Sequence, residues 1–281
     1  MTDLELSLAI ENLMVQRNLR GMAQIQSALQ PGYYLRGAEF LRGCTGTILI
    51  GTGFPVLDTF ETDGPVGAIA LYQALSELGA RPVIVCGKPL SRALAADYRV
   101  HEIAVGNPAE REQEARAALA ALSPQVIISI ERPGLSATGR YFNMRGEDIS
   151  ARCACFDHFL NFADCPSLAI GDGGNEIGMG NVGPALAVLD IVPAVTRCDE
   201  LLIADVSNWA ALGLIAIIGY WQGVDLLGKI SPREILGYLS ERGSVDGVTR
   251  KNTLTEDGLA VEEGEQVLEA LRTLAGFGDG E

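Results

Sequence analysis

Histidine and lysine are scarce in this chain, and the few that occur are His101, His158, Lys88, Lys229 and Lys251. His101 falls at the start of a predicted strand, away from the carboxyl ends where ligands bind in parallel sheets. A Ser-His-Asp or Cys-His catalytic arrangement is therefore poorly supported. Pyridoxal phosphate would need a lysine for its Schiff base. Lys88 follows a predicted strand, but its neighbour Pro89 is more typical of a turn, which disfavours this cofactor.

Basic residues are also few, because the chain has 21 lysines and arginines but 36 acidic residues, which gives a net charge of −15. This charge repels nucleic acids and anionic membranes, so neither is an expected partner. The longest apolar run, residues 209–221, is too short to span a bilayer. Asp3 and Glu5 stand where a signal peptide would be positively charged. We therefore expect a cytoplasmic protein.

The familiar nucleotide fingerprints are missing. No Lys-Ser/Thr pair completes a P-loop, and the segment 51–55, GTGFP, lacks the third glycine of GxGxxG. Binding of a nicotinamide or flavin cofactor is therefore not indicated, and no organic cofactor is expected.

The six cysteines are scattered, and a large cytosolic chain needs no disulfide frame. Cys153, Cys155, His158 and Cys165 have the ligand types of a zinc site. Their CxC spacing departs from the usual C-x2-4-C pair, however, and several neighbouring residues are apolar or aromatic. We therefore expect these cysteines to be buried for structural reasons.

Short apolar runs alternate with helical segments from about residue 46 onward. Most runs are continuous in valine, isoleucine and leucine, as expected for strands covered on both faces. The predicted strands are 47–52, 82–86, 100–105, 125–130, 167–170 and 200–205. The predicted helices between and after them are 65–78, 108–122 and 207–221. This alternation predicts an α/β fold with a Rossmann-like, mostly parallel sheet flanked by helices.

Further helices are expected towards both ends, at residues 4–16, 22–29, 33–42, 232–241 and 259–274. Because no linker or shift in composition separates these segments, we expect one domain over residues 1–281, with the helical residues 1–45 packed on it. The apolar helix 207–221 fits either the centre of the core or a contact with a second subunit. A homo-oligomer is therefore left open.

The most informative segment is the loop 171–183, which holds six glycines and follows the apolar run 167–170. Glycine permits positive φ and close approach to a ligand, so a loop of this kind after a strand can present main-chain N–H groups. Asp172, Asn175 and Glu176 lie within it. We predict that this loop forms part of an active site.

Other acidic side chains also follow the carboxyl ends of strands, where ligands bind in open parallel sheets. Asp58, Glu61 and Asp63 come after strand 47–52. Together with the two acids of the glycine loop, they suit acid–base chemistry or a hard cation such as Mg²⁺ or Mn²⁺. The metal candidates are Asp58, Asp63, Asp172 and Glu176. The alternative for Asp63 is an N-cap of the next helix, and Glu61 is expected to be exposed.

Three arginines follow strand 125–130 in the segment ERPGLSATGRYFNMRGEDIS, namely Arg132, Arg140 and Arg145. Arginine binds carboxylate or phosphate bidentately, so this segment indicates a small anionic substrate. A salt bridge to one of the many acids is the alternative for any single arginine. Glu131 and Asn143 of the same segment are further candidates for substrate binding.

These segments resemble the D-glutamate cyclase family, whose domain occurs alone in bacteria and as the C-terminal part of a longer mitochondrial protein in animals. The matching stretches are IENLMVQRN, GFPVLDTFETDGPVGAIALYQAL, IERPGLSATGRYFNMRGEDIS and IGDGGNEIGMGNVG. They span roughly residues 10 to 205. The activity of that family is the reversible cyclisation of D-glutamate to 5-oxo-D-proline with loss of water.

The resemblance implies that the substrate is a small dicarboxylic amino acid, whose carboxylates the three arginines would hold. The base, the acid or the metal ligands would come from Asp172, Glu176, Asp58 and Asp63. The tetrahedral oxyanion would be stabilised by the loop amides of Gly173, Gly174 and Asn175.

Two other interpretations are left open. The chain could be a phosphate- or nucleotide-binding protein, in which the glycine loop and the arginines hold an anion. It could also be a sensor that binds a small acid and signals through a partner. The density of carboxylates favours an enzyme over a sensor, because recognition alone needs no proton transfer.

Overall fold

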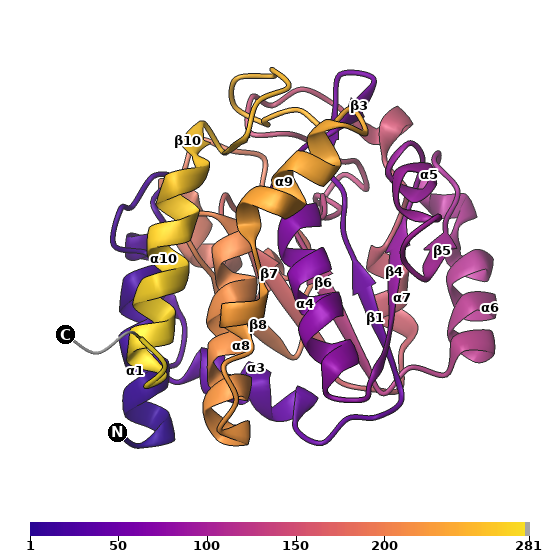
Figure 1. The fold of residues 1–281 in the computed structure, drawn as a ribbon. Coiled ribbons are helices and arrows are strands. Elements are labelled where there is room, and N and C mark those ends of the chain that lie inside the picture. Colours follow the sequence, from indigo (N-terminus) through magenta and orange to yellow (C-terminus); the bar gives the residue numbers. More distant parts are fainter. Residues whose placement is uncertain (279–281) are drawn as a thin grey trace.

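A six-stranded parallel sheet runs through the centre of the computed structural model, which describes residues 1–278 (Figure 1). Its strands are β1 Thr47–Gly51, β4 Arg81–Cys86, β5 Val100–Glu102, β6 Val126–Ile130, β7 Ser167–Gly171 and β8 Glu200–Ile203. They lie in the order β5-β4-β1-β6-β7-β8, and each neighbouring pair is parallel. This is the doubly wound order, in which the direction of winding reverses between β1 and β6. The predicted Rossmann-like fold is confirmed.

Helices cover both faces of the sheet (Figure 1). On one face α4 Pro65–Glu77 and α8 Ser207–Gln222 pack side by side. Around them pack α1 Asp3–Met14, α3 Tyr33–Leu41, α9 Pro232–Ser240 and α10 Val261–Leu274. On the opposite face α6 Glu112–Leu122 packs against α7 Asp157–Phe162. In the part of the chain that the structure describes, no helix is long and apolar enough to cross a membrane.

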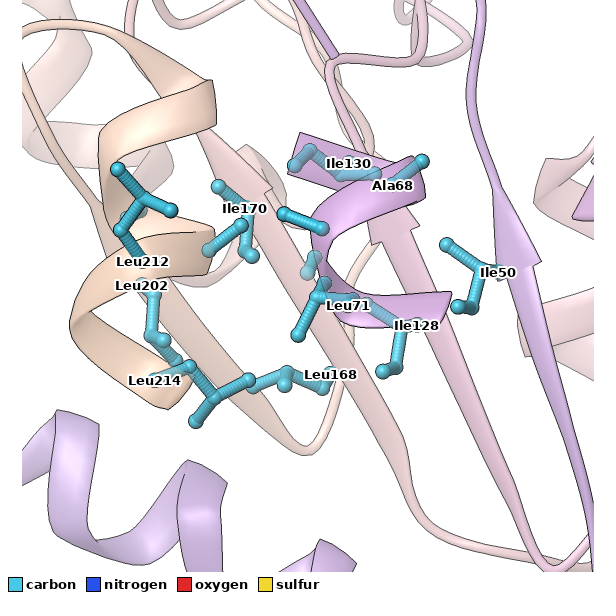
Figure 2. Close-up of a cluster of buried hydrophobic side chains, with 14 of the residues drawn as sticks. Ile50, Ala68, Leu71, Ile128, Ile130, Leu168, Ile170, Leu202, Leu212 and Leu214 are labelled. Carbon is cyan, nitrogen blue, oxygen red and sulfur yellow. The ribbon is translucent and has the colours of Figure 1, made fainter. Parts of the chain in front are cut away.

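Aliphatic side chains fill the space between the sheet and the layer of α4 and α8, as Figure 2 shows. Ile50 and Ile128 of the sheet lie near Leu71 of α4 in this cluster. Full burial of each such side chain contributes about 1.5–3 kcal/mol relative to exposure. Every residue of α8 from Ser207 to Gly219 is buried within this single chain. This helix therefore lies at the centre of the core.

Reciprocal caps hold the starts of α4 and α8 against each other. Asp63 accepts hydrogen bonds from the N–H groups of Ser207 (3.0 Å) and Asn208 (2.8 Å) at the start of α8. In return, Asn208 Oδ1 accepts from the N–H groups of Gly64 (2.8 Å) and Gly67 (2.7 Å) at the start of α4. The helices can approach this closely because Gly67 has no side chain, and a Cβ there would lie 3.1 Å from Asn208 Cα. Asp63 is thus a helix cap, but it caps α8 and not the helix that follows it.

Two short hairpins were not predicted. One pairs β2 Pro55–Val56 with β3 Thr59–Phe60, and the other pairs β9 Thr255–Glu256 with β10 Leu259–Ala260. Asp257 and Gly258 turn the second hairpin with φ values of 52° and 81°, as a tight Asp-Gly turn requires. The predicted helix 259–274 therefore begins only at Val261. The remaining short helices and 3-10 turns are α2 Met22–Ile25, α5 Leu90–Leu94, η1 Gln26–Ala28, η2 Pro108–Glu110, η3 Ser150–Arg152, η4 Met179–Val188 and η5 Leu227–Lys229.

Asn208→Ala is expected to lower the free energy of unfolding by about 3 kcal/mol or more, because several buried groups lose their hydrogen-bond partners. The Asn208 amide also donates to Thr62 O (3.2 Å) and to Glu256 Oε1 (2.6 Å). Chemical denaturation followed by circular dichroism measures the change. The control is Asn107→Ala, which removes the exposed cap of η2 and should cost less than about 1 kcal/mol. Equal losses in the two variants would contradict the importance of the reciprocal caps.

Candidate active site

Three buried carboxylates converge at the carboxyl edge of the sheet. Glu131 directly follows β6, Asp172 directly follows β7, and Asp63 lies between β3 and α4. The exposed fractions are 5% for Glu131, 0% for Asp172 and 1% for Asp63. One oxygen from each carboxylate lies within 4.8 Å of the other two. The parallel sheet is the cause, because β6 and β7 pair Ile130 with Ile170 and so bring the residues that follow them side by side.

Ser207, the first residue of α8, contacts all three carboxylates. Its N–H group donates to Asp63 Oδ2 (3.0 Å) and lies 3.3 Å from Asp172 Oδ2, and its hydroxyl donates to Glu131 Oε2 (2.6 Å). The partial positive charge of a helix N-terminus favours anions at this position. The start of α8 therefore offsets part of the negative charge of the cluster.

Arg20, in the loop between α1 and α2, is the basic partner of the cluster. Its guanidinium forms ion pairs with Asp172 and with Asp257, which lies in the turn of the β9–β10 hairpin. The Asp257 side chain is only 5% exposed, so these ion pairs are largely screened from water. Neither Arg20 nor Asp257 was predicted from the sequence, since neither lies at the end of a strand of the sheet. The Asp257-Gly258 pair is a hairpin signal, but it does not say what the hairpin packs against.

Burial raises the pKa of Glu61, Asp63, Glu131 and Asp172 above the usual range of carboxyl groups, and repulsion between the neighbouring acids raises it further. Burial lowers the pKa of Arg20, but the carboxylates of its acidic neighbours outweigh this effect and raise it. Arg20 therefore remains charged, and burial together with mutual repulsion favours the protonated form of the acids around it.

Glu61 is buried, which corrects the expectation that it is exposed. Its exposed fraction is 7%. The segment around it pairs with the loop after α9, where the N–H of Thr62 donates to Val245 O (2.9 Å) and the N–H of Val245 donates to Phe60 O (3.0 Å). This pairing covers Glu61 with a segment that is distant in the sequence, so the local pattern did not indicate its burial.

The glycine-rich loop closes on itself around Glu176. The Glu176 carboxylate accepts hydrogen bonds from the N–H groups of Gly173 (3.0 Å) and Gly174 (2.8 Å). Two of the three amides that were expected to bind an oxyanion are therefore engaged within the loop. Burial raises the pKa of Glu176, although these N–H donors favour its ionised form. Asn175 donates to Phe142 O (3.0 Å), and its buried Oδ1 has no partner within residues 1–278.

A cavity of about 250 Å³ borders this cluster. Four acids line it, namely Glu61, Glu131, Glu147 and Asp257. Four arginines also line it, namely Arg20, Arg145, Arg152 and Arg250. Asn143 and Asn175 add amide groups to its wall. The lining therefore combines two buried acids of raised pKa, Glu61 and Glu131, with arginines that can bind a carboxylate.

The three arginines predicted to bind substrate lie in different places. Arg145 is exposed and lines the cavity, where it donates to Val248 O (3.0 Å). Arg140 is exposed, pairs with Asp148 (3.0 Å) and is not part of the lining. Arg132 is buried, and its guanidinium donates to backbone carbonyl groups outside this cavity. The spacing of these arginines in the sequence did not indicate that only one of them lines the cavity.

The other residues predicted for the site also lie in different places. Asp58 lies exposed in the turn between β2 and β3 and does not join the buried carboxylates. Asp63, Asp172, Glu176 and the glycines of the loop lie outside the cavity lining, behind the acids that face it. Cys153 and Cys155 are buried, as expected, whereas Cys165 is only half-buried.

Glu256 of β9 supports the start of α8 and has a pKa close to neutrality. Its carboxylate accepts hydrogen bonds from Asn208 (2.6 Å) and Trp209 (3.4 Å), while burial raises its pKa to about 7. A carboxyl group with a raised pKa binds its proton more tightly in the folded state. Its contribution to stability is therefore complete at acidic pH and is lost as the pH rises from about 4.5 to about 7.

Glu256→Gln is expected to reduce the loss of stability between pH 5 and pH 8 by up to about 3 kcal/mol. Urea denaturation at the two pH values measures this difference. The control is Glu262→Gln, because Glu262 is exposed and its hydrogen bond with Arg233 lowers its pKa, so it stays ionised across this window. A pH dependence that is unchanged in Glu256→Gln would show that another group titrates there.

Comparisons with known proteins agree with the resemblance noted in the sequence. A curated relative, the mitochondrial D-glutamate cyclase of Homo sapiens, is 32% identical over 198 residues, which cover 60% of this chain and 32% of that protein. The match thus spans about a third of the length of the relative.

Two solved structures align with this chain at low similarity, and each alignment covers 90% of this chain and 62% of the other. One is an exopolyphosphatase-related protein from Bacteroides fragilis, with 10% identity and a TM-score of 0.42. The other is a mycobacterial protein complexed with NADPH, with 13% identity and a TM-score of 0.28. These scores are too low to support an argument. The profile of the family described as "D-glutamate cyclase-like, C-terminal", by contrast, matches residues 10–272, and the chain therefore belongs to this family.

Proposed function

We propose that the chain interconverts D-glutamate and 5-oxo-D-proline, with release of water when the ring closes. The observation that carries the proposal is a buried cluster of carboxyl groups that borders a cavity lined by four arginines. The name of the human relative supports D-glutamate as the substrate and cyclisation as the reaction.

The cavity suits a small dicarboxylate. Its volume of about 250 Å³ is below the range of most drug-sized ligand sites, so a compact amino acid is a better match than a nucleotide. Arg145, Arg152 and Arg250 line it and can bind the two carboxylates of glutamate through charge-assisted hydrogen bonds. Glu61 and Glu131 are suited to the ammonium group, which is positive.

Ring closure moves two protons from nitrogen to oxygen. The α-ammonium group loses one proton to become a nucleophile, and it loses another when the C–N bond forms at the γ-carboxyl carbon. Both protons end on one γ-oxygen, which leaves as water when its C–O bond breaks. Buried carboxyl groups of raised pKa are suited to accept and donate these protons.

We assign the proton transfers to Glu61, Glu131 and Asp257, because these are the buried acids of the lining. The fourth acid, Glu147, is exposed and pairs with Arg250 (2.9 Å). Arg20 lines it as well and is suited to stabilising the negative charge of the tetrahedral intermediate. Asp172 is a positioning residue in this proposal, since its ion pair holds Arg20.

Two residues of the glycine-rich loop have supporting roles in this proposal. The unpartnered Oδ1 of Asn175 can accept a hydrogen bond from the substrate amine, because Asn175 lines the cavity. Glu176 holds the loop in shape through the two glycine N–H groups that donate to it.

Phosphate binding is the alternative function, and it is less favourable because a phosphate has no ammonium group to pair with Glu61 and Glu131 in this cavity. A thermal-shift screen separates the two. D-glutamate or 5-oxo-D-proline should raise the melting temperature, whereas nucleotides should not. Stabilisation by nucleotides but not by D-glutamate or 5-oxo-D-proline would favour phosphate binding. Binding of the amino acid without turnover would instead favour a sensor.

Glu131→Gln is expected to lower turnover by about 100-fold or more, because general acid–base catalysis by a positioned group contributes this much. Asp172→Asn should cause a similar loss, since Arg20 loses one of its anchors. The assay follows D-glutamate released from 5-oxo-D-proline. Asp58→Asn is the control and should keep its rate, because Asp58 is exposed and lies outside the cluster. Near-normal rates in both test variants would refute the proposal.

The same cluster has the ligand types of a site for a divalent cation. Asp63, Glu131 and Asp172 offer three oxygens at close spacing, and several further acids surround them against the single charge of Arg20. Mg²⁺ or Mn²⁺ would be held by these carboxylates and would polarise the γ-carboxyl group when bound.

A cation at this position should raise the stability of the wild-type protein, by about 2.7 kcal/mol at a hundred-fold excess over its dissociation constant. Thermal denaturation with MnCl₂ or MgCl₂ after treatment with EDTA measures the effect. Glu131→Gln should lose the response, and Asp58→Asn should keep it. If MnCl₂ and MgCl₂ do not stabilise the wild-type protein, the cluster holds no divalent cation, and its negative charge is reduced by protonation alone.

A further inference from the structure

A second and smaller cavity lies where the winding of the sheet reverses. Its volume is about 20 Å³, and its lining includes Thr52 after β1, Lys88 after β4 and Arg132 after β6. Doubly wound sheets bind their ligands at this reversal. The space admits a water molecule or a small anion, but not a nucleotide.

Arg132 is a buried cation without a counter-ion in the described part of the chain. It is 3% exposed and donates to the carbonyl groups of Thr52 (2.8 Å) and Ala154. It forms no ion pair within residues 1–278. The nearby buried acid Asp157 accepts hydrogen bonds from Leu135 (2.9 Å), Tyr141 (2.6 Å) and Thr196. A buried charge that lacks a partner of opposite sign is strongly unfavourable.

The thiols around Arg132 do not supply the missing negative charge. Burial raises the pKa of Cys86 to about 12 and that of Cys155 to about 11. Burial also raises the pKa of Cys153, which lines the cavity. All three are therefore neutral thiols at physiological pH.

Two buried polar atoms near this cavity lack hydrogen-bond partners among the described residues, namely Thr52 Oγ1 and Arg132 Nε. Arg132 Nε is a donor of a lining residue, whereas Thr52 Oγ1 lies beside Gly64, on the side of Glu131. The basic residues Lys88, Arg132 and Arg152 line this cavity, and no acidic residue of the described chain does. This is unusual in a protein with a net charge of −15.

We propose that this cavity binds a small anion, of the size of a halide ion or of the end of a carboxylate or phosphate group, through Lys88 and Arg132. The anion supplies the missing counter-ion of Arg132 and accepts hydrogen bonds from the Arg132 guanidinium and the Lys88 ammonium group. The Lys88 ammonium lies at the exposed side of the cavity, where it also pairs with Glu102 (3.0 Å).

The anion site is separate from the cavity proposed for the substrate. The two cavities share Phe54, Pro55 and Arg152, but Glu131 lines only the larger one and Arg132 only the smaller one. The inference therefore does not depend on the cyclase activity and needs no substrate for its test.

The test is anion binding by the full chain, prepared in gluconate, which is too large for the cavity. Chloride, acetate and phosphate are titrated separately at constant ionic strength, with calorimetry and thermal denaturation as readouts. At least one should bind at one site per chain and raise the melting temperature to a plateau. The order of the three affinities distinguishes a halide, a carboxylate and a phosphate as the natural ligand.

Lys88→Gln should weaken this binding about tenfold. It should still fold, because Lys88 is half exposed and its side chain pairs only with Glu102 at the surface. Two controls should bind the anion like the wild type: Lys229→Gln, an exposed lysine paired with Glu77 far from the cavity, and Arg145→Gln in the larger cavity. The proposal is overturned if the wild type binds none of the three anions, or if Arg145→Gln weakens binding as much as Lys88→Gln.

Discussion

Ser207 contacts three buried carboxylates at once, and the arrangement of the candidate site depends on this contact. The residue begins α8, a helix that the core surrounds along most of its length. The start of α8 therefore cannot shift without disturbing both the core and the acids. The positive charge of Arg20 and of the N-terminus of α8, in turn, offsets part of the free-energy cost of burying these carboxylates.

The reversal of the sheet between β1 and β6 separates two chemical environments. Glu131 has a φ of 44°, a strained conformation for a residue other than glycine, and such strain is common at functional sites. Its side chain lines the acidic cavity, while that of the next residue, Arg132, lines the basic one. The ring of Phe156 lies against Gly51 at the end of β1, where a Cβ would be 2.2 Å from a ring carbon. An aromatic ring and a guanidinium thus occupy the region where many doubly wound folds hold a dinucleotide.

Much of the fold was predictable because its signals are local. Continuous apolar runs identify the buried strands, and parallel strands bring their carboxyl ends to one edge, so Asp63 and Asp172 could be predicted as neighbours. Glu131 was expected only to bind substrate, yet it joins these two acids. Burial of Glu61 and the contribution of Arg20 were not predictable, because each depends on loops distant in the sequence. The same reason explains why the arginines after β6 could not be told apart, since spacing does not say whether a guanidinium meets a carbonyl group, a carboxylate or water.

The ion pairs of Arg20 have a consequence for biosynthesis. One partner, Asp172, follows β7, and the other, Asp257, lies beyond all six strands of the sheet. On the ribosome, Arg20 emerges early, the strands follow, and the hairpin that carries Asp257 leaves the exit tunnel late. A nascent chain that has already formed its sheet therefore still lacks one wall of the acidic cavity. The candidate site is thus completed only after all six strands of the sheet have been synthesised.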